Sequence, residues 1–568
     1  MTRDDAYILF WDDDIKEHCY FNSLTTSRLS EFLNLSIINY PWYLRSLKQI
    51  PLISRGKKGL RGRLYNFANT TKSKLKYINA IRLIQGKSKI YVNSGSPRWQ
   101  YHLNSSLKKR TIVFICIKSA LQYLLIKVRG IAHVSGYRLS LVDIKNHLTV
   151  DLSLQAKMSA DVLSSADKKV YKMYLNSLIW HTLNSLNRMS TITSANNNIP
   201  LIISTSVYSL DWICRDYALK KGYMHRFATS TPFNREHSNL LKIHKSYAED
   251  LHTRRSCQEN LSVNSRILDE AVEYGLFYIN SRFHSLTSHT YSPLDSSFAE
   301  LLPYLKKCNN VDKKLWVYFS NSPDELKSID HSIRESGTTN LYCTRESGAA
   351  QSEEEAIKLL ARLAVKCNAE LVVRLHPRLG RDQRVKKESS ALQGLLNACR
   401  EAHGPEHGPV NIVMPEDKIN SYILGILADK VICFRGTMPL ELSLLGIKPI
   451  VLAKEKGFSN FWIKIHSDSA PKSSLELQRQ LEDPVNLYKP SELATFLIEF
   501  WTIFKLGEIS LNDNTTQKLV SAIYSDEYIA SEFSVFQSPS LATVDPAKLS
   551  RICDKYAAKA RKLVANWF

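Results

Sequence analysis

Short apolar runs alternate with longer amphipathic stretches through the second half of the chain. An apolar run between turn residues is typical of a buried strand, and apolar residues at every third or fourth position are typical of a helix. The pattern predicts strands at 315–319, 370–375, 410–413, 430–434 and 448–452, and helices at 352–367, 389–401, 419–427 and 439–445. This alternation favours an α/β fold with a parallel sheet covered on both faces. Ligands bind such sheets at the carboxyl ends of the strands, so we expect function in the loops that follow them.

The first half of the chain has a weaker pattern. It predicts a strand at 6–11, a helix at 165–189, a strand at 200–205 with a helix that stops at Gly222, and a helix at 267–283. Between 40 and 110 no clear period appears, and no element is predicted there. The polar segment 308–314 marks the predicted boundary between an N-terminal domain, 1–309, and a C-terminal domain, 310–500, which a helical tail, 501–568, follows.

Positive charge is concentrated in one region. The net charge is +22, and between Glu31 and Asp143 the chain has no Asp or Glu but 21 Lys and Arg residues. We expect this acid-free region, 32–142, to face an anionic partner such as lipid head groups, an acidic glycan or nucleic acid. A solvated basic face without a partner is the alternative. Aromatic residues interleave with the cations between 40 and 101, as stacking surfaces for nucleic acid require.

The amino-terminal residues place acids on both sides of a short apolar run, whereas a signal peptide has a positive start and a longer apolar stretch. Ten cysteines without a Cys-x-x-Cys pair are typical of reduced thiols. We therefore expect a cytoplasmic protein, with peripheral contact to an anionic membrane on its inner face. The apolar run 111–128 contains Lys118 and Gln122 and barely reaches the length of a bilayer span, so it is predicted to be a buried or interfacial helix.

Two loops after the first predicted strands of the second half carry groups that suit phosphate or ribose oxygens. Ser320 and Ser322 follow 315–319, where they either bind phosphate or form an ordinary turn. The strand 370–375 ends in a cluster in which proline stiffens the chain and an imidazole stands beside two guanidinium groups. These residues are Arg374, His376, Pro377 and Arg378.

Two further loops lead into helices, whose free backbone amides can bind an anion. In the third loop Ser421 and Tyr422 are candidates, although Asn420 and Ser421 are equally read as plain helix caps. In the fourth loop a glycine permits close approach to a ligand, Thr437 is the expected helix cap, and a glutamate can accept hydrogen bonds from a ribose. The candidates there are Arg435, Gly436, Thr437 and Glu441. The acidic run 12–14 is interpreted as a solvated turn, so no metal site and no cofactor are predicted.

These loops resemble a known family. The segments SNSPDE, RLHPR, PEDKINSYILGILADKVI and GTMPLELSLLGIKPIVL, within 315–452, are similar in order and spacing to the C-terminal domain of bacterial capsular polysaccharide biosynthesis proteins. These are relatives of the GT-B Kdo and sialic acid transferases. The resemblance implies two Rossmann-type domains facing a central cleft, here with a basic N-terminal insertion. It also implies a nucleotide-sugar donor, CMP-linked by preference, bound by His376, Pro377, Ser421, Gly436, Thr437 and Glu441. The chain departs from the family pattern, Ser-Thr-x-Gly, at Gly436-Thr437-Met438-Pro439.

In a GT-B enzyme the acceptor lies against the N-terminal domain and no metal is required. We therefore expect the catalytic base to be Asp211 or Glu236, and Arg235 or His237 to hold an acidic acceptor, although each is equally read as a turn or helix-start residue. The predicted activity is transfer of a sugar from a nucleotide donor to a surface polysaccharide or its lipid-linked acceptor. The alternatives are a sugar-nucleotide epimerase or a polyol-phosphate transferase of the same fold, and a nucleic-acid-binding protein acting through the basic aromatic region.

Overall fold

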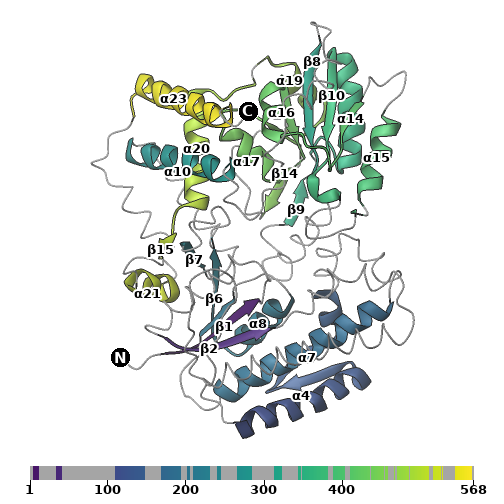
Figure 1. The fold of residues 1–568 in the computed structure, drawn as a ribbon, viewed down its shortest axis with the longest axis vertical. Coiled ribbons are helices and arrows are strands. Elements are labelled where there is room, and N and C mark those ends of the chain that lie inside the picture. The colour runs from purple at the N-terminus through teal and green to yellow at the C-terminus, as the bar shows by residue number, and fades with distance from the viewer. Residues whose placement is uncertain are drawn as a thin grey trace. The chain divides into compact units, whose positions relative to one another are not determined.

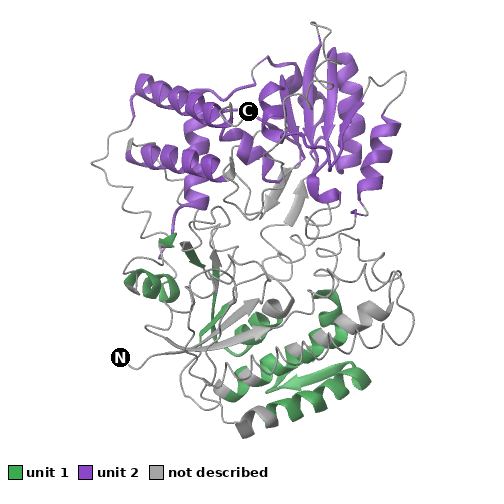
Figure 2. Ribbon diagram, viewed as in Figure 1, with its two compact units in different colours: residues 1–231, 237–246, 508–526 green, residues 232–236, 247–507, 527–568 purple. Residues whose placement is uncertain are grey.

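A computed structural model describes residues 4–11, 33–40, 109–147, 168–193, 201–204, 209–230, 240–244, 265–283, 313–322, 343–346, 348–380, 388–389, 391–402, 410–434, 436–452, 454–457, 466, 470–484, 486–510, 516–525, 528 and 544–565. The chain forms two compact units (Figure 2). Unit 1 comprises Met1–Thr231, His237–Ser246 and Glu508–Asp526. Unit 2 comprises Pro232–Glu236, Tyr247–Gly507 and Glu527–Phe568.

A five-stranded sheet forms the centre of unit 2, and all its paired strands are parallel, as predicted. Its strands are β8 (Lys314–Phe319), β10 (Ala369–Arg374), β11 (Val410–Val413), β12 (Lys430–Cys433) and β13 (Ile450–Val451), in the order β11-β10-β8-β12-β13. Nearly every strand residue is buried, because helices cover both faces. The short antiparallel pair β9 (Cys343–Glu346) and β14 (Lys454–Gly457) was not predicted.

Helices flank this sheet close to their predicted positions. They are α14 (Glu353–Lys366), α15 (Leu392–Glu401), α16 (Ser421–Leu427) and α17 (Met438–Ser443), with a 3-10 turn, η3, at Pro377–Leu379. The helix α19 (Ser474–Glu482) was not predicted. Buried residues of α14, α15 and α19 share one core with Trp316 and Tyr318 of β8, so these helices cover one face. Residues of α16 do not belong to that core although α16 packs on β8, which places α16 on the other face.

The predicted domain limits differ from the units of the structure. Helix α10 (Ser265–Phe283) was predicted within the N-terminal domain, 1–309, but it belongs to unit 2. It packs there on α20 (Pro490–Phe504) and α23 (Pro546–Ala565) (Figure 1). Phe500 of α20 contacts the rings of Tyr274 and Tyr278 of α10 at centroid distances of 5.8 and 5.1 Å. The C-terminal segment is likewise not a separate tail, since α23 is part of this layer.

Unit 1 has a six-stranded mixed sheet in the order β15-β7-β6-β5-β1-β2. The strands are β1 (Asp4–Trp11), β2 (Leu33–Tyr40), β5 (Leu201–Ser204), β6 (Met224–Ser230), β7 (Leu240–His244) and β15 (Ile509–Ser510). β2, β1, β5 and β6 are parallel, whereas β7 pairs antiparallel with β6, and the edge strand β15 pairs antiparallel with β7. The segment Glu508–Asp526 returns from unit 2 to this unit. Nε of Arg226 in β6 donates to Ile523 O in α21 (Thr516–Tyr524), at 2.6 Å.

The predicted helices of the first half are confirmed as α4 (Lys109–Arg129), α7 (Lys168–Thr193) and α8 (Ser209–Lys220). A hairpin of β3 (Ile131–Val134) and β4 (Tyr137–Ser140), which was not predicted, turns at Ser135 and Gly136 with φ of 49° and 82°. Buried residues of α4, the hairpin, α7 and α8 form one core beside β5. No helix among the described ranges is long and apolar enough to cross a bilayer.

We expect Gly275→Ala to destabilise unit 2. An added Cβ on Gly275 would lie 2.7 Å from the hydroxyl of Tyr556 and 3.2 Å from Cδ2 of Leu497. Overpacking of this kind costs about 1–3 kcal/mol, and the better helix propensity of alanine offsets up to about 1 kcal/mol of it. Urea unfolding followed by tryptophan fluorescence should show a loss of about 1–2 kcal/mol.

Gly394→Ala in α15 is the matched control. Gly394 is exposed, and the added Cβ would meet only Glu354 Oε1, at 3.4 Å. The control should therefore leave the unfolding free energy unchanged or raise it by up to about 1 kcal/mol. Equal effects of the two substitutions would show that α10 does not pack on α20 and α23 as described.

Candidate functional site

The carboxyl edge of the unit 2 sheet contains a reversal of strand order. From β8 the chain runs outward to β10 and β11 on one side, and then returns to place β12 and β13 on the other side. Doubly wound α/β sheets bind ligands at such a reversal, because the loops after the two central strands lead away from each other. Here these are the loops that follow β8, at 320–322, and β12, at 434–437.

The two central loops touch at Gly436. This residue has a φ of +104°, which side chains disfavour, and an added Cβ would lie 2.7 Å from Asn321 Oδ1. Asn321 is buried, and its Nδ2 has no hydrogen-bond partner among the described residues. A buried amide without a partner is rare in proteins and calls for an acceptor. The reversal point therefore presents an amide donor that none of the described residues accepts from.

Glu353 fixes the backbone of the loop that follows β8. Its Oε1 accepts hydrogen bonds from Asn321 N at 2.7 Å and from the Tyr318 hydroxyl at 3.3 Å. Burial, together with the nearby Glu353 carboxylate, raises the pKa of Tyr318 well above its ordinary value, so the phenol stays a donor. The carboxylate lies in the first turn of α14, where the helix dipole favours negative charge. Asn321 and Glu353 were not among the predicted site residues.

The loop after β10 is tied to the loop after β8. Ser320 Oγ accepts from His376 N at 2.8 Å, and both residues are predicted site residues. His376 caps η3, whose first residue is Pro377, and its Nδ1 accepts from Arg378 N at 3.1 Å. Because Nδ1 is an acceptor, the neutral ring carries its proton on Nε2.

Arg374 orders the third loop. Its side chain is buried, Nη1 donates to Met414 O, and Nη2 donates to Asp417 O at 3.4 Å. Asp417 Oδ2 in turn accepts from Met414 N at 2.7 Å. Arg374 was predicted to bind the donor, but its hydrogen bonds described here go to loop carbonyls. Its burial and these contacts support a positioning role.

Asn420 caps α16, as one of the two readings of this loop predicts. Its Oδ1 accepts from Tyr422 N at 2.8 Å and from Ile423 N at 3.3 Å. These donors fix the amide orientation, so its Nδ2, which is buried and has no partner among the described residues, faces away from the helix end. Ser421, the first residue of α16, is buried beside it. The third loop thus presents a second unused amide donor.

The fourth loop corrects one expectation. Thr437 stands at the N-cap of α17, but its backbone is helical and its side chain makes no capping hydrogen bond. Glu441, one turn further, is buried, and its carboxylate accepts from the Tyr422 hydroxyl. Helices α16 and α17 pack so closely that a Cβ on Gly425 would lie 2.6 Å from Leu442 Cδ2. Glu441 and Tyr422, which were both predicted as ligand contacts, thereby join two helices behind the loops.

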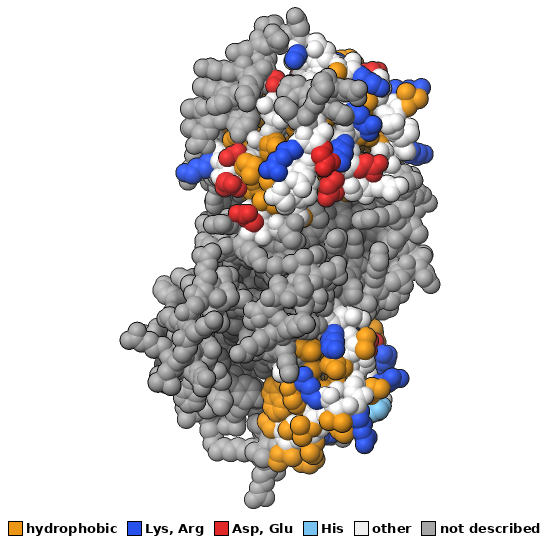
Figure 3. Space-filling model, turned by 90° about the vertical axis from the view of Figure 1, so that its right-hand side faces the viewer, with side chains coloured by type: hydrophobic (Ala, Val, Ile, Leu, Met, Phe, Trp, Pro, Cys, Tyr) orange, Lys and Arg blue, Asp and Glu red, His pale blue; other side chains and the backbone are white. Residues whose placement is uncertain are grey.

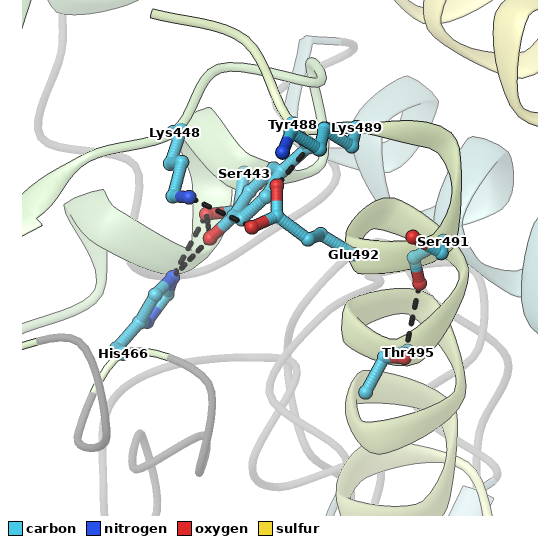
Figure 4. Close-up of polar contacts among 8 residues, drawn as sticks. All are labelled: Ser443, Lys448, His466, Tyr488, Lys489, Ser491, Glu492 and Thr495. Carbon is cyan, nitrogen blue, oxygen red and sulfur yellow. Dashed lines mark hydrogen bonds and ion pairs between the residues drawn. The ribbon is translucent and has the colours of Figure 1, made fainter. Parts of the chain in front are cut away.

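A buried polar triad holds the end of α17 (Figure 4). Ser443 Oγ lies 2.9 Å from His466 Nε2 and 3.2 Å from the Tyr488 hydroxyl, and the latter two atoms are 3.1 Å apart. Burial lowers the pKa of His466 from 6.5 to about 3, so the ring is neutral. Beside the triad, Glu492 accepts from Lys448 Nζ at 2.8 Å and from Lys489 N at 3.0 Å at the start of α20.

Several predicted residues lie outside the described part of the chain. These are Arg235, Glu236, His237 and Arg435. Asp211 falls in the first turn of α8, and its side chain is also outside the description. Ser322 is buried after β8, and Arg378 is partly exposed at η3. Within the described ranges, no group of three His, Cys, Asp or Glu side chains is placed to hold a metal ion.

Comparison with known proteins returns no relative. No protein-family model, curated protein or solved structure matches the chain. The site consists of loops that follow four parallel strands at one edge of the sheet. Ser320, Arg374 and Gly436 connect these loops to one another.

His466 should make unit 2 less stable at acidic pH. The unfolded chain binds a proton at this residue below about pH 6.5, whereas the folded chain does so only near pH 3, so the stability present above pH 6.5 is lost as the pH falls. Between pH 7 and pH 5 the residue accounts for a loss of about 2 kcal/mol. In His466→Gln, urea unfolding at the two pH values should show a dependence smaller by this amount.

His133→Gln is the control for this experiment, since His133 is exposed on β3. It should keep the pH dependence of the native chain. If His466→Gln keeps it as well, burial of a neutral imidazole does not explain the acid sensitivity.

Proposed function

We propose that this protein is a glycosyltransferase of the GT-B type that binds a nucleotide sugar at the carboxyl edge of the unit 2 sheet. The observation that carries the proposal is the contact between Gly436 and Asn321 at the reversal of strand order. Doubly wound sheets bind nucleotides at this position, and the glycine allows the two central loops to come into contact there. The resemblance of the four loop segments to capsular polysaccharide biosynthesis proteins supports the same reading.

The side-chain amides without a partner among the described residues suit a nucleotide-sugar ligand. Asn321 Nδ2 and Asn420 Nδ2 are buried at the ends of loops that follow β8 and β11, where phosphate or base oxygens would be their acceptors. His376, held with its proton on Nε2, supplies a further donor after β10. Such fixed donors stabilise a leaving nucleotide without reorganisation during the reaction. The donor is a nucleotide sugar, CMP-linked by preference.

The acceptor in this proposal is a surface polysaccharide or its lipid-linked precursor. Asp211 or Glu236 would be the base that deprotonates the acceptor hydroxyl, and Arg235 or His237 would hold an acidic acceptor. The basic region 32–142 suits an acidic glycan of this kind, because it contains no Asp or Glu.

One nucleotide class should raise the thermal stability of the native chain. A panel of CMP-, UDP-, GDP- and CDP-linked sugars tests this, because a ligand at about 100 times its Kd adds about 2.7 kcal/mol to the unfolding free energy. His376→Asn should lose the response. Asparagine can still cap η3, so the variant separates the imidazole's ligand role from its contact with Arg378 N.

His133→Asn, at an exposed position of unit 1, is the matched control and should respond as the native chain does. No stabilisation by any of the four classes would contradict the proposal. If the stabilising nucleotide sugar is consumed without an acceptor, the activity is epimerisation of the nucleotide sugar and not transfer.

A further inference from the structure

Helix α4 exposes a continuous apolar stripe. Six of the thirteen exposed large apolar side chains of the described residues lie on it, each between 41% and 83% exposed. They are Phe114, Ile117, Leu121, Leu124, Leu125 and Val128. At 3.6 residues per turn these positions share one helix face about 100° wide. Figure 3 shows apolar side chains gathered on the described part of unit 1. Contiguous apolar surface of this kind marks an interaction site.

The buried face of α4 combines polar side chains with the buried Ile115 and Ile126. Ser119 and Gln122 are both buried and accept from Asn187 Nδ2 of α7, at 3.0 and 2.5 Å. Gln122 Nε2 donates to His133 O at 2.6 Å. A helix on the surface of a water-soluble domain normally turns its apolar stripe to the core and its polar groups outward. α4 departs from this pattern because it also carries an apolar stripe on its outer face, which suits contact with an apolar phase.

Cations border the stripe and acids are absent from it. By helical position Lys118 and Arg129 lie along one border and Lys127 along the other. The sequence from 109 to 142 contains no Asp or Glu. Arg138 and Lys145, in the segments that follow, are exposed. An apolar face with a cationic border is the pattern of helices that lie in the interface of an anionic bilayer.

We infer that α4 is a monotopic membrane-docking helix, whose apolar stripe enters the head-group boundary of an anionic lipid surface while its cations contact the lipid phosphates. This inference does not rest on the proposed enzymatic function, because α4 belongs to unit 1 and the nucleotide loops belong to unit 2. A second copy of the chain fits less well. Two stripes packed together would bring their cationic borders against each other, with no acid between 109 and 142 to pair them.

Flotation of the full chain with lipid vesicles tests the inference. Vesicles of phosphatidylcholine alone are compared with vesicles of equal parts phosphatidylcholine and phosphatidylglycerol. The native chain should float with the anionic vesicles, and less so at high salt. Leu121→Gln combined with Leu124→Gln should weaken this binding by about tenfold or more. Lys118→Gln combined with Arg129→Gln should weaken only the anionic preference, also by about tenfold.

The matched control replaces exposed apolar residues of unit 2. Val365→Gln combined with Leu475→Gln removes similar side chains, 47% and 57% exposed, from helices without such a stripe. It should leave vesicle binding unchanged. All variants should keep the native circular dichroism and thermal unfolding, because the replaced residues are exposed or, for Lys118, half-buried. The Leu121 and Leu124 variant should also keep any nucleotide response, so that failure here and failure of the proposed function are separable.

Two outcomes would overturn the inference. One is vesicle binding that is absent, or that the Leu121 and Leu124 substitutions leave unchanged. The other is a chain that self-associates in sedimentation, does not float, and dissociates when these leucines are replaced, which would assign the stripe to a contact between copies.

Discussion

Burial of a parallel sheet on both faces constrains the rest of unit 2. Because helices cover both sides of β8, β10 and β12, their side chains have to be apolar or internally paired, and polar chemistry is confined to the strand ends. The reversal of strand order then selects one stretch of that edge. At this point two loops approach until only a glycine fits. The loop after β10 is tied to the loop after β8, and the loop after β11 is tied to Arg374 at the end of β10. The candidate site follows from the topology of the sheet more than from any single residue.

The apolar pattern was sufficient to predict this sheet and four of its helices, but not α19. Runs such as 315–319 are short, strongly apolar and bounded by polar residues, so period and length agree on a strand. The pattern failed where tertiary contacts decide the structure. Helix α10 was recognised, but nothing in its sequence indicates that α20 and α23, far along the chain, complete its layer. The pairing of β15 with β7 depends on a segment more than 260 residues away, beyond the reach of local periodicity.

The positions of the candidate site residues could be predicted from the sequence, but the role of each residue could not. Strand ends could be located, so residues such as Ser320 and His376 were found, and the structure joins them by a hydrogen bond. The division of labour was not visible, because a sequence does not tell whether a guanidinium points outward or into a loop, as Arg374 does. Glu353 was missed since an acid in the first turn of a helix is ordinary. Only the tertiary fold brings its carboxylate within hydrogen-bonding distance of Asn321 N.

The two regions proposed to carry function differ in which groups they leave unpaired. Around Asn321 and Asn420 the backbone is fixed by buried hydrogen bonds, while donors are left without partners inside an ordered frame. That arrangement is costly for the free protein and is repaid only by an acceptor that arrives from outside. In α4 the buried Ser119 and Gln122 accept hydrogen bonds from Asn187, while a stripe of apolar side chains is left exposed. Each region leaves one kind of interaction unmade, hydrogen bonding in unit 2 and apolar burial in unit 1. The proposed partners therefore differ in kind: a polar small molecule for the first region and an apolar surface with anionic groups for the second.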